Sequence, residues 1–174
     1  MATQVMPYVD LPLLHRMYQA WQRNDVAAAM KWNRYLLAMR ESSELLQEDC
    51  AMGRALARLA HDLECALPTS LRSTDALSYA AAFAWLSVCW DIEARDALRG
   101  YWWSWCENQV AAAVKLIPLG QTAGQRMLLE LGAAMPDVVA RGMACADDDI
   151  GMTAHGLGIA SALHETQHTR LFRS

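Results

Sequence analysis

The chain has 174 residues, of which 54% are hydrophobic and 20% are charged, and its formal net charge is -4. This length suits one domain with a sizeable core, and the composition excludes a disordered chain. The small acidic excess argues against a nucleic-acid-binding protein, because such a protein needs a basic face.

Helical periodicity runs through almost the whole chain, and we find no alternating β pattern. Asp10 is placed to cap the first helix, and Asp25 to cap the second after a break at Asn24. The expected helices begin near Asp10, Val26, Leu45, Asp75, Asp91, Gly120, Pro136 and Leu157. We therefore expect residues 1–174 to form a single all-α domain, an antiparallel bundle of about seven to eight helices.

The most apolar stretch runs from Tyr79 to Trp90, between Asp75 and Asp91. It is too short to cross a bilayer, which takes about twenty residues, so it predicts a buried core helix. The first ten residues lack the basic region and apolar run of a signal peptide. We expect a cytoplasmic protein with no membrane contact.

Five cysteines occur at irregular spacings, with no C-x-x-C pair: Cys50, Cys65, Cys89, Cys106 and Cys145. An odd number in this pattern argues against a disulfide framework or a zinc ribbon. We expect reduced thiols, each acting as a small buried residue.

The segment His164-Glu-Thr-Gln-His168 matches the H-E-x-x-H pattern of zinc proteases. Two histidines four apart on a helix point the same way, and Glu165 could polarise a metal-bound water. A catalytic zinc needs a third protein ligand, however, and few residues follow His168. The remaining histidines show no spacing relation to the pair, so we interpret the match as a coincidence. A zinc-dependent hydrolase stays as the alternative.

A charged stripe comprises Arg40, Glu41, Glu44, Glu48 and Asp49. We expect Arg40 and Glu44 to form an i,i+4 pair on a helix, whereas Glu44 and Glu48 repel at the same spacing. A solvated helix face explains most such stripes. Because the repulsive pair adds no stability, a recognition face is the functional interpretation.

Gly120 and Gly124 do not belong to a phosphate-binding loop, because Gln125-Arg126 stands where that loop needs Lys and Ser or Thr. We expect a break after Pro118 and a helix start where Gly120 allows close backbone approach. Trp102, Trp103 and Trp105 cannot all face one way on a helix. Core positions are expected for some of them, and a neighbouring subunit for others.

The end of the chain, residues 169–174, alternates Arg170 and Arg173 with Leu171 and Phe172. A frayed terminus is the usual interpretation. An apolar pair between two arginines also suits docking into a groove of another protein, with ordering on binding.

Five segments resemble, in order, those of the urease accessory protein family UreF: Asp10-Leu-Pro-Leu-Leu14, Arg40 to Asp49 with Met52-Gly53, Tyr101 to Val110, Lys115 to Leu129, and His164 to Ser174. In that family the position of His168 is usually Tyr, which supports coincidence for the zinc pattern. Family members usually carry a further N-terminal segment, so we expect a fragment or a short homologue.

This resemblance implies an all-α accessory protein without catalytic activity that helps to insert nickel into apo-urease. The implied partners are a UreD/UreH-type protein and the GTPase UreG, with the chain itself as a homodimer. Nickel and GTP would be handled by these partners, and no cofactor or metal would bind the chain directly. The expected partner-binding residues are Arg40, Glu41, Glu44, Glu48, Lys115, Pro118, Gly120, Gln121, Gln125, His164, Glu165, Gln167, Arg170, Leu171, Phe172, Arg173 and Ser174, with 164–174 as a docking tail. A generic helical adaptor is a further alternative.

Overall fold

The computed structural model describes residues 3–68, 76–117 and 119–167 of the chain. These residues form seven α-helices and two short 3₁₀ helices, without a strand, which confirms the all-α expectation. The elements are η1 (Met6–Tyr8), α1 (Asp10–Gln22), α2 (Val26–Ala38), α3 (Ser43–Asp62), α5 (Tyr79–Cys89), α6 (Ala94–Leu116), α7 (Gln121–Ala144), η2 (Asp147–Asp149) and α8 (His155–Glu165).

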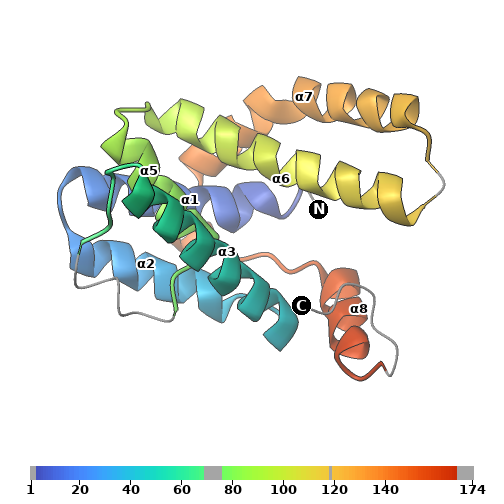
Figure 1. Cartoon of the computed structure of the whole chain (residues 1–174), viewed down its shortest axis with the longest axis horizontal. Helices are drawn as coiled ribbons and strands as arrows, with labels where there is room; N and C mark the ends of the chain where they lie inside the picture. Colours follow the sequence, from blue (N-terminus) through green and yellow to red (C-terminus); the bar gives the residue numbers. More distant parts are fainter. Residues whose placement is uncertain (1–2, 69–75, 118, 168–174) are drawn as a thin grey trace.

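Helices α1 and α5 form the centre of the bundle (Figure 1). α1 packs against α2, α5, α6 and α7, and nearly all of its residues are buried. Ala80, Ala81, Ala82 and Ala84 of α5 have no exposed surface, so the neighbouring helices can approach this thin helix closely. The apolar stretch that begins at Tyr79 is therefore a core helix, as predicted. Within the described ranges, no helix is both long and apolar enough to span a bilayer.

Helices α6 and α7 form an antiparallel pair whose connecting end projects beyond the other helices in Figure 1. Two glycines bring α7 against its neighbours. A Cβ at Gly124 would lie 2.8 Å from Cγ2 of Val114 in α6, and one at Gly142 would lie 2.6 Å from Cβ of Leu11 in α1. The expectation of separate helices beginning near Gly120 and Pro136 is wrong, because α7 continues through Pro136. Packing at both of its ends outweighs the local cost of the proline, which is about 3 kcal/mol.

Of the aspartates expected at helix starts, Asp25 has its expected role, whereas Asp10 and Asp75 do not. Asp25 caps α2 as predicted, and its carboxylate accepts a hydrogen bond from the Ala28 amide at 2.9 Å. Asp10 does not cap α1, because it is the first helical residue and its carboxylate binds Arg40 instead. α5 begins at Tyr79 with Ser78 as its cap, and not at Asp75, which lies outside the described residues.

The expectation that every cysteine is reduced is wrong for one pair. Cys65, just beyond α3, forms a disulfide with Cys89 at the end of α5, with their Cα atoms 6.1 Å apart. The two residues are 24 apart in sequence and meet only because α3 packs along α5, so their spacing gave no sign of the bond. The other three cysteines are free and buried, as expected: Cys50, Cys106 and Cys145.

Candidate partner-binding surfaces

A buried ion network connects the start of α1, the α2–α3 loop and α3. Arg40 donates from Nη2 to Oδ1 of Asp10 at 2.8 Å and from Nε to Oδ2 of Asp49 at 2.7 Å. The other carboxylate oxygen of Asp49 accepts from the backbone amide of Tyr79 at 2.7 Å, at the first turn of α5. Both aspartate side chains are only 8% exposed, so the network holds three separate segments together from inside.

The charges in this network perturb the groups around them. Burial lowers the pKa of Arg40, but the carboxylates of Asp10 and Asp49 outweigh burial and raise it above its ordinary value, so the guanidinium stays charged. Burial, aided by the same two carboxylates, raises the pKa of Tyr101 well above its ordinary value. The Tyr101 hydroxyl therefore stays protonated, and it lies 3.4 Å from Oδ1 of Asp10 as a donor.

The expected i,i+4 pair between Arg40 and Glu44 is wrong, because Arg40 and Glu41 precede α3 and lie in a loop. Sequence spacing could suggest only Glu44 as a partner, whereas the fold supplies two buried carboxylates to Arg40. Glu44 pairs instead with His164 of α8, whose Nδ1 lies 2.6 Å from Glu44 Oε2. Arg40 and Asp49 of the charged stripe thus lie in the buried network, whereas Glu44 lies in the partly exposed first turn of α3.

Helix α8 is held against the start of α3 by polar contacts. Oε1 of Glu165 accepts hydrogen bonds from Ser43 Oγ at 2.7 Å and from the Glu44 amide at 3.2 Å, which satisfies an amide of the first turn of α3. Further contacts join Ser42 Oγ to Ser161 Oγ at 2.6 Å and the Ala154 amide to Glu41 Oε1 at 3.0 Å. Expected partner-binding residues from opposite ends of the sequence therefore lie together here: Glu41, Glu44, His164 and Glu165.

These contacts give His164 and Glu165 roles that need no zinc. Both side chains face α3, where they bind Glu44 and Ser43. Among the residues that the structure describes, no group of three His, Cys, Asp or Glu side chains could hold a metal ion. His168 and the tail residues 169–174, including Arg170, lie outside the described residues.

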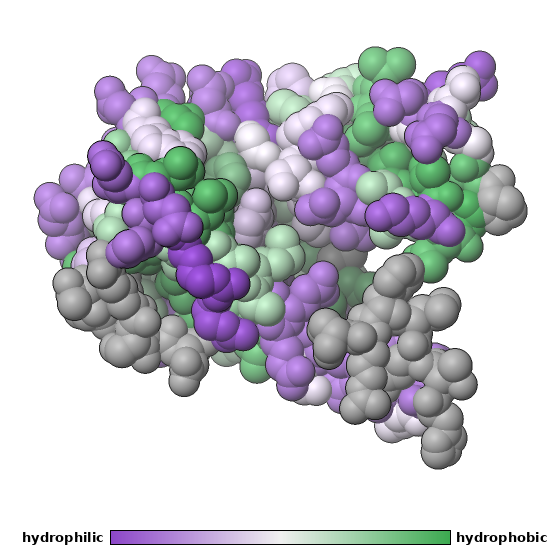
Figure 2. Space-filling view, in the orientation of Figure 1, coloured by the Kyte–Doolittle hydropathy of each residue, from purple (hydrophilic) through white to green (hydrophobic). Residues whose placement is uncertain are grey.

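A second exposed surface lies at the tip of the α6–α7 pair. Lys115, Gly120, Gln121 and Gln125 are exposed there, and Pro118 lies outside the described residues. Two apolar side chains join them, with Leu116 56% and Ile117 53% exposed. Figure 2 shows apolar surface gathered at this end of the pair. An exposed apolar tip with a polar rim is typical of a protein-binding surface.

The role expected for Gly120 is wrong in one respect. Its φ is -67°, which any residue adopts, and a Cβ added there would meet nothing within 4 Å. The close approach that the glycine pair predicted occurs at Gly124, against Val114. A side chain at position 120 would point into open space, so Gly120 is not needed for the fold.

A cavity of about 640 Å³ opens between η1, the α2–α3 loop, α6 and the segment before α8. Arg40, Glu41 and Glu48 line it together, so the structure unites three of the expected binding residues. Apolar and aromatic side chains form much of the remaining wall, among them Tyr101, Trp105, Met152 and Leu157, and polar side chains of α6 such as Asn108 and Gln109 join them. Trp102 faces the core without exposed surface, whereas Trp105 is partly buried and borders the cavity.

Sequence reasoning missed several residues that shape these surfaces. Asp10 and Asp49 fix Arg40, Ser43 and Ser161 hold α8, and none of them was an expected binding residue. The sequence signal that could have pointed to Asp10 and Asp49 is their position on the apolar face of a helix, in register with Leu14 and Met52 respectively. The serines resemble ordinary helix-end residues, and nothing in their spacing marks them.

Comparison with known proteins gives one consistent result. The family model described as UreF matches residues 3–132. A protein named urease accessory protein UreF from Alkalilimnicola ehrlichii is 45% identical over 168 residues, which cover 95% of this chain and 73% of that protein. The like-named proteins of Methylobacillus flagellatus and Pseudomonas putida are 44% and 42% identical, over 95% and 97% of this chain and 74% and 75% of their own length.

Proposed function

Because this chain belongs to the UreF family of urease accessory proteins, we propose that it is a scaffold for maturation of the urease nickel centre. In this role it bridges a UreD/UreH-type protein and the GTPase UreG on apo-urease and modulates GTP-dependent nickel insertion. It works in the cytoplasm as a homodimer, has no catalytic activity of its own, and leaves nickel and GTP to its partners. The observation that carries the proposal is the family relation over 95% or more of the chain.

We assign the tip of the α6–α7 pair to UreG. The exposed residues Lys115, Gln121 and Gln125 offer hydrogen bonds and charge around the apolar side chains of Leu116 and Ile117. Apolar groups inside a polar rim match the anatomy of transient protein interfaces. The tip projects from the bundle, so a partner can reach it without disturbing the core (Figure 1).

We assign the C-terminal segment, residues 164–174, to the UreD/UreH-type protein. Glu165 and His164 already engage α3, and Gln167 follows them at the exposed end of α8. Arg40, Glu41, Glu44 and Glu48 complete this side of the molecule at the α2–α3 loop and the start of α3. The buried setting of Arg40 makes it a support for this surface, while the exposed Glu41 and Glu48 can contact a partner directly.

Substitution at the tip tests the proposal. Gly120→Val adds a bulky side chain in open space, so the fold should survive while UreG is no longer recruited. Gly100→Val is the matched control, because Gly100 is also exposed, and an added Cβ would make only an ordinary contact of 3.6 Å with Phe83. Co-purification with the two accessory proteins and urease activation in cells are the measurements. Normal UreG recruitment by Gly120→Val, with helical circular dichroism intact, would contradict the assignment.

A further inference from the structure

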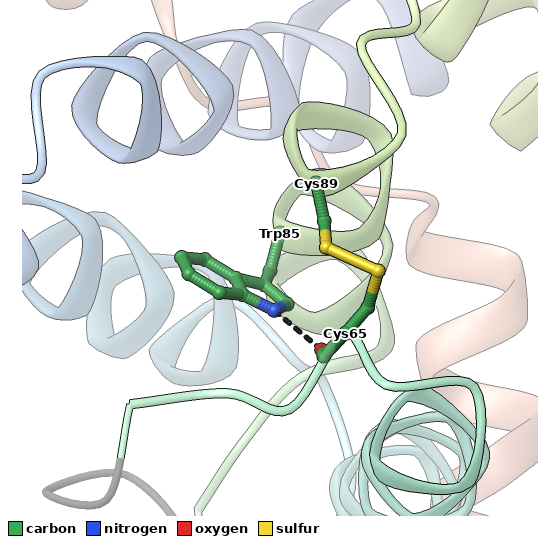
Figure 3. Close-up of a disulfide and its surroundings, with 3 residues drawn as sticks. All are labelled: Cys65, Trp85 and Cys89. Atoms are coloured by element: carbon green, nitrogen blue, oxygen red, sulfur yellow. Dashed lines mark hydrogen bonds between the residues drawn. A yellow bond between two sulfur atoms is a disulfide. The ribbon is translucent and has the colours of Figure 1, made fainter.

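The disulfide between Cys65 and Cys89 joins the ends of two helices that are also held together without it (Figure 3). The indole Nε1 of Trp85, in α5, donates a hydrogen bond to the backbone oxygen of Cys65 at 2.9 Å. Trp85 is itself fixed by an edge-on contact with buried Trp21, with ring centroids 5.3 Å apart. If the sulfur–sulfur bond opens, this contact keeps the two thiols near each other, so the bond can form again.

The two sulfur-bearing residues differ in access to solvent. Cys89 is exposed, whereas Cys65 is 9% exposed. The remaining cysteines, Cys50, Cys106 and Cys145, are all buried. Among the described cysteines a soluble thiol therefore has its access at the exposed residue Cys89, which makes Cys89 the attacked side and Cys65 the leaving group.

We propose that Cys65 and Cys89 form a reversible thiol–disulfide site that exchanges with low-molecular-weight thiols of the glutathione type. A glutathione thiolate attacks Sγ of Cys89, the bond to Cys65 breaks, and Cys65 leaves as a thiolate that takes a proton. A second glutathione thiolate then attacks the mixed disulfide on Cys89 and releases glutathione disulfide and the Cys89 thiol. Two electrons and two protons pass from two glutathione molecules to the protein, and glutathione disulfide drives the reverse reaction.

The site controls how firmly the last turns of α3 are held. Near its middle, α3 is fixed on α5 at Gly53, where an added Cβ would lie 2.7 Å from the backbone carbon of Ser78. Beyond that point Ala60 is buried, but Leu59 and Leu63 are 49% and 47% exposed, so much of the apolar surface of these turns stays in solvent. Opening the bond leaves them anchored by the packing of Ala60 and by the hydrogen bond from Trp85 to the Cys65 backbone, and local fraying becomes easier.

Thiol mapping tests the chemistry. The full-length protein is equilibrated in glutathione buffers of different thiol-to-disulfide ratio, alkylated under denaturing conditions and digested for mass spectrometry. We expect Cys65 and Cys89 to gain and lose alkylation together as the ratio changes, while the other cysteines stay fully alkylated. The proposal is overturned if the pair stays reduced in glutathione disulfide, or stays oxidised in reduced glutathione while the protein is native.

Hydrogen exchange tests the structural consequence. On reduction, the amides of Leu63 and Cys65, which bond to Leu59 and Ala60, should exchange about tenfold faster, while amides of α1 are unchanged. In Cys89→Ser the same amides should exchange fast in every buffer. In Cys50→Ser, the matched control, they should respond to reduction as in the wild type. If these amides exchange equally fast in the oxidised and the reduced wild type, the disulfide does not restrain the last turns of α3, whatever the variants show.

Discussion

Removing the charge of Arg40 should destabilise the fold strongly. Arg40→Met keeps the aliphatic stem but leaves Asp10 and Asp49, each only 8% exposed, without their common cation. Breaking a buried ion pair from one side costs about 3–5 kcal/mol, because a charge stays buried and uncompensated. That is a large share of a typical stability of about 5–15 kcal/mol. For a domain of this size it corresponds to a fall in Tm of about 6–20 °C.

Urea denaturation followed by circular dichroism, together with thermal melting, measures this loss. Arg34→Met is the matched control, because Arg34 is an exposed arginine of α2, and it should change stability by about 0.5 kcal/mol at most. Adding Asp10→Asn and Asp49→Asn to Arg40→Met should restore most of the loss, since the stranded charges are removed. If Arg40→Met and Arg34→Met are equally stable, the network does not support the fold and Arg40 acts only in binding.

Further predictions concern the ends of the chain and its response to acid. Burial, and to a smaller degree the charge of Arg16, lowers the pKa of His15 below 6.5, so stability should fall as the pH drops below about 6.5 and level off under the lowered pKa. His15→Gln should remove this part of the pH dependence in urea titrations. Glu165→Ala should cost about 0.5–1.5 kcal/mol through the lost hydrogen bonds from Ser43 and the Glu44 amide, with faster amide exchange in α8. Metal analysis should find no stoichiometric zinc, and one zinc per chain that is lost in His164→Ala would reverse this interpretation. Truncation after Thr169 should leave the helical fold intact and abolish pull-down of the UreD/UreH-type protein, which wild-type binding by the truncated chain would contradict.

Local sequence signals predicted much of the fold. The polar break at Asn24 and Asp25 marks a helix boundary by backbone chemistry alone, and the structure has it there, with Asn24 at φ 54°. Pro136 was misleading, because the penalty of a proline is local while the packing that outweighs it is not. Gly124 and Gly142, close to the two ends of α7, show this packing: Gly124 faces Val114 of α6, and Gly142 faces Leu11 of α1, which is distant in sequence.

The candidate surfaces were predicted less completely, for the same physical reason. The expected break after Pro118 and helix start at Gly120 predicted a turn between α6 and α7, and such a turn lies at the surface. The partners of Arg40 are 30 and 9 residues away, on other helices, and only the packed structure brings them together. The contact of Glu165 with Ser43 spans 122 positions and rests on α8 folding back over α3.

That fold-back makes α8 a competitor inside the same molecule. A partner that binds Glu165 or His164 first has to take them from Ser43 and Glu44. A tethered segment acts at an effective concentration of about millimolar, so weak contacts suffice to occupy the site. If α8 were docked about nine-tenths of the time, the partner would bind about tenfold more weakly than to a chain without the contact. Mutations that loosen α8 would then strengthen binding while lowering stability, so affinity and stability would change in opposite directions.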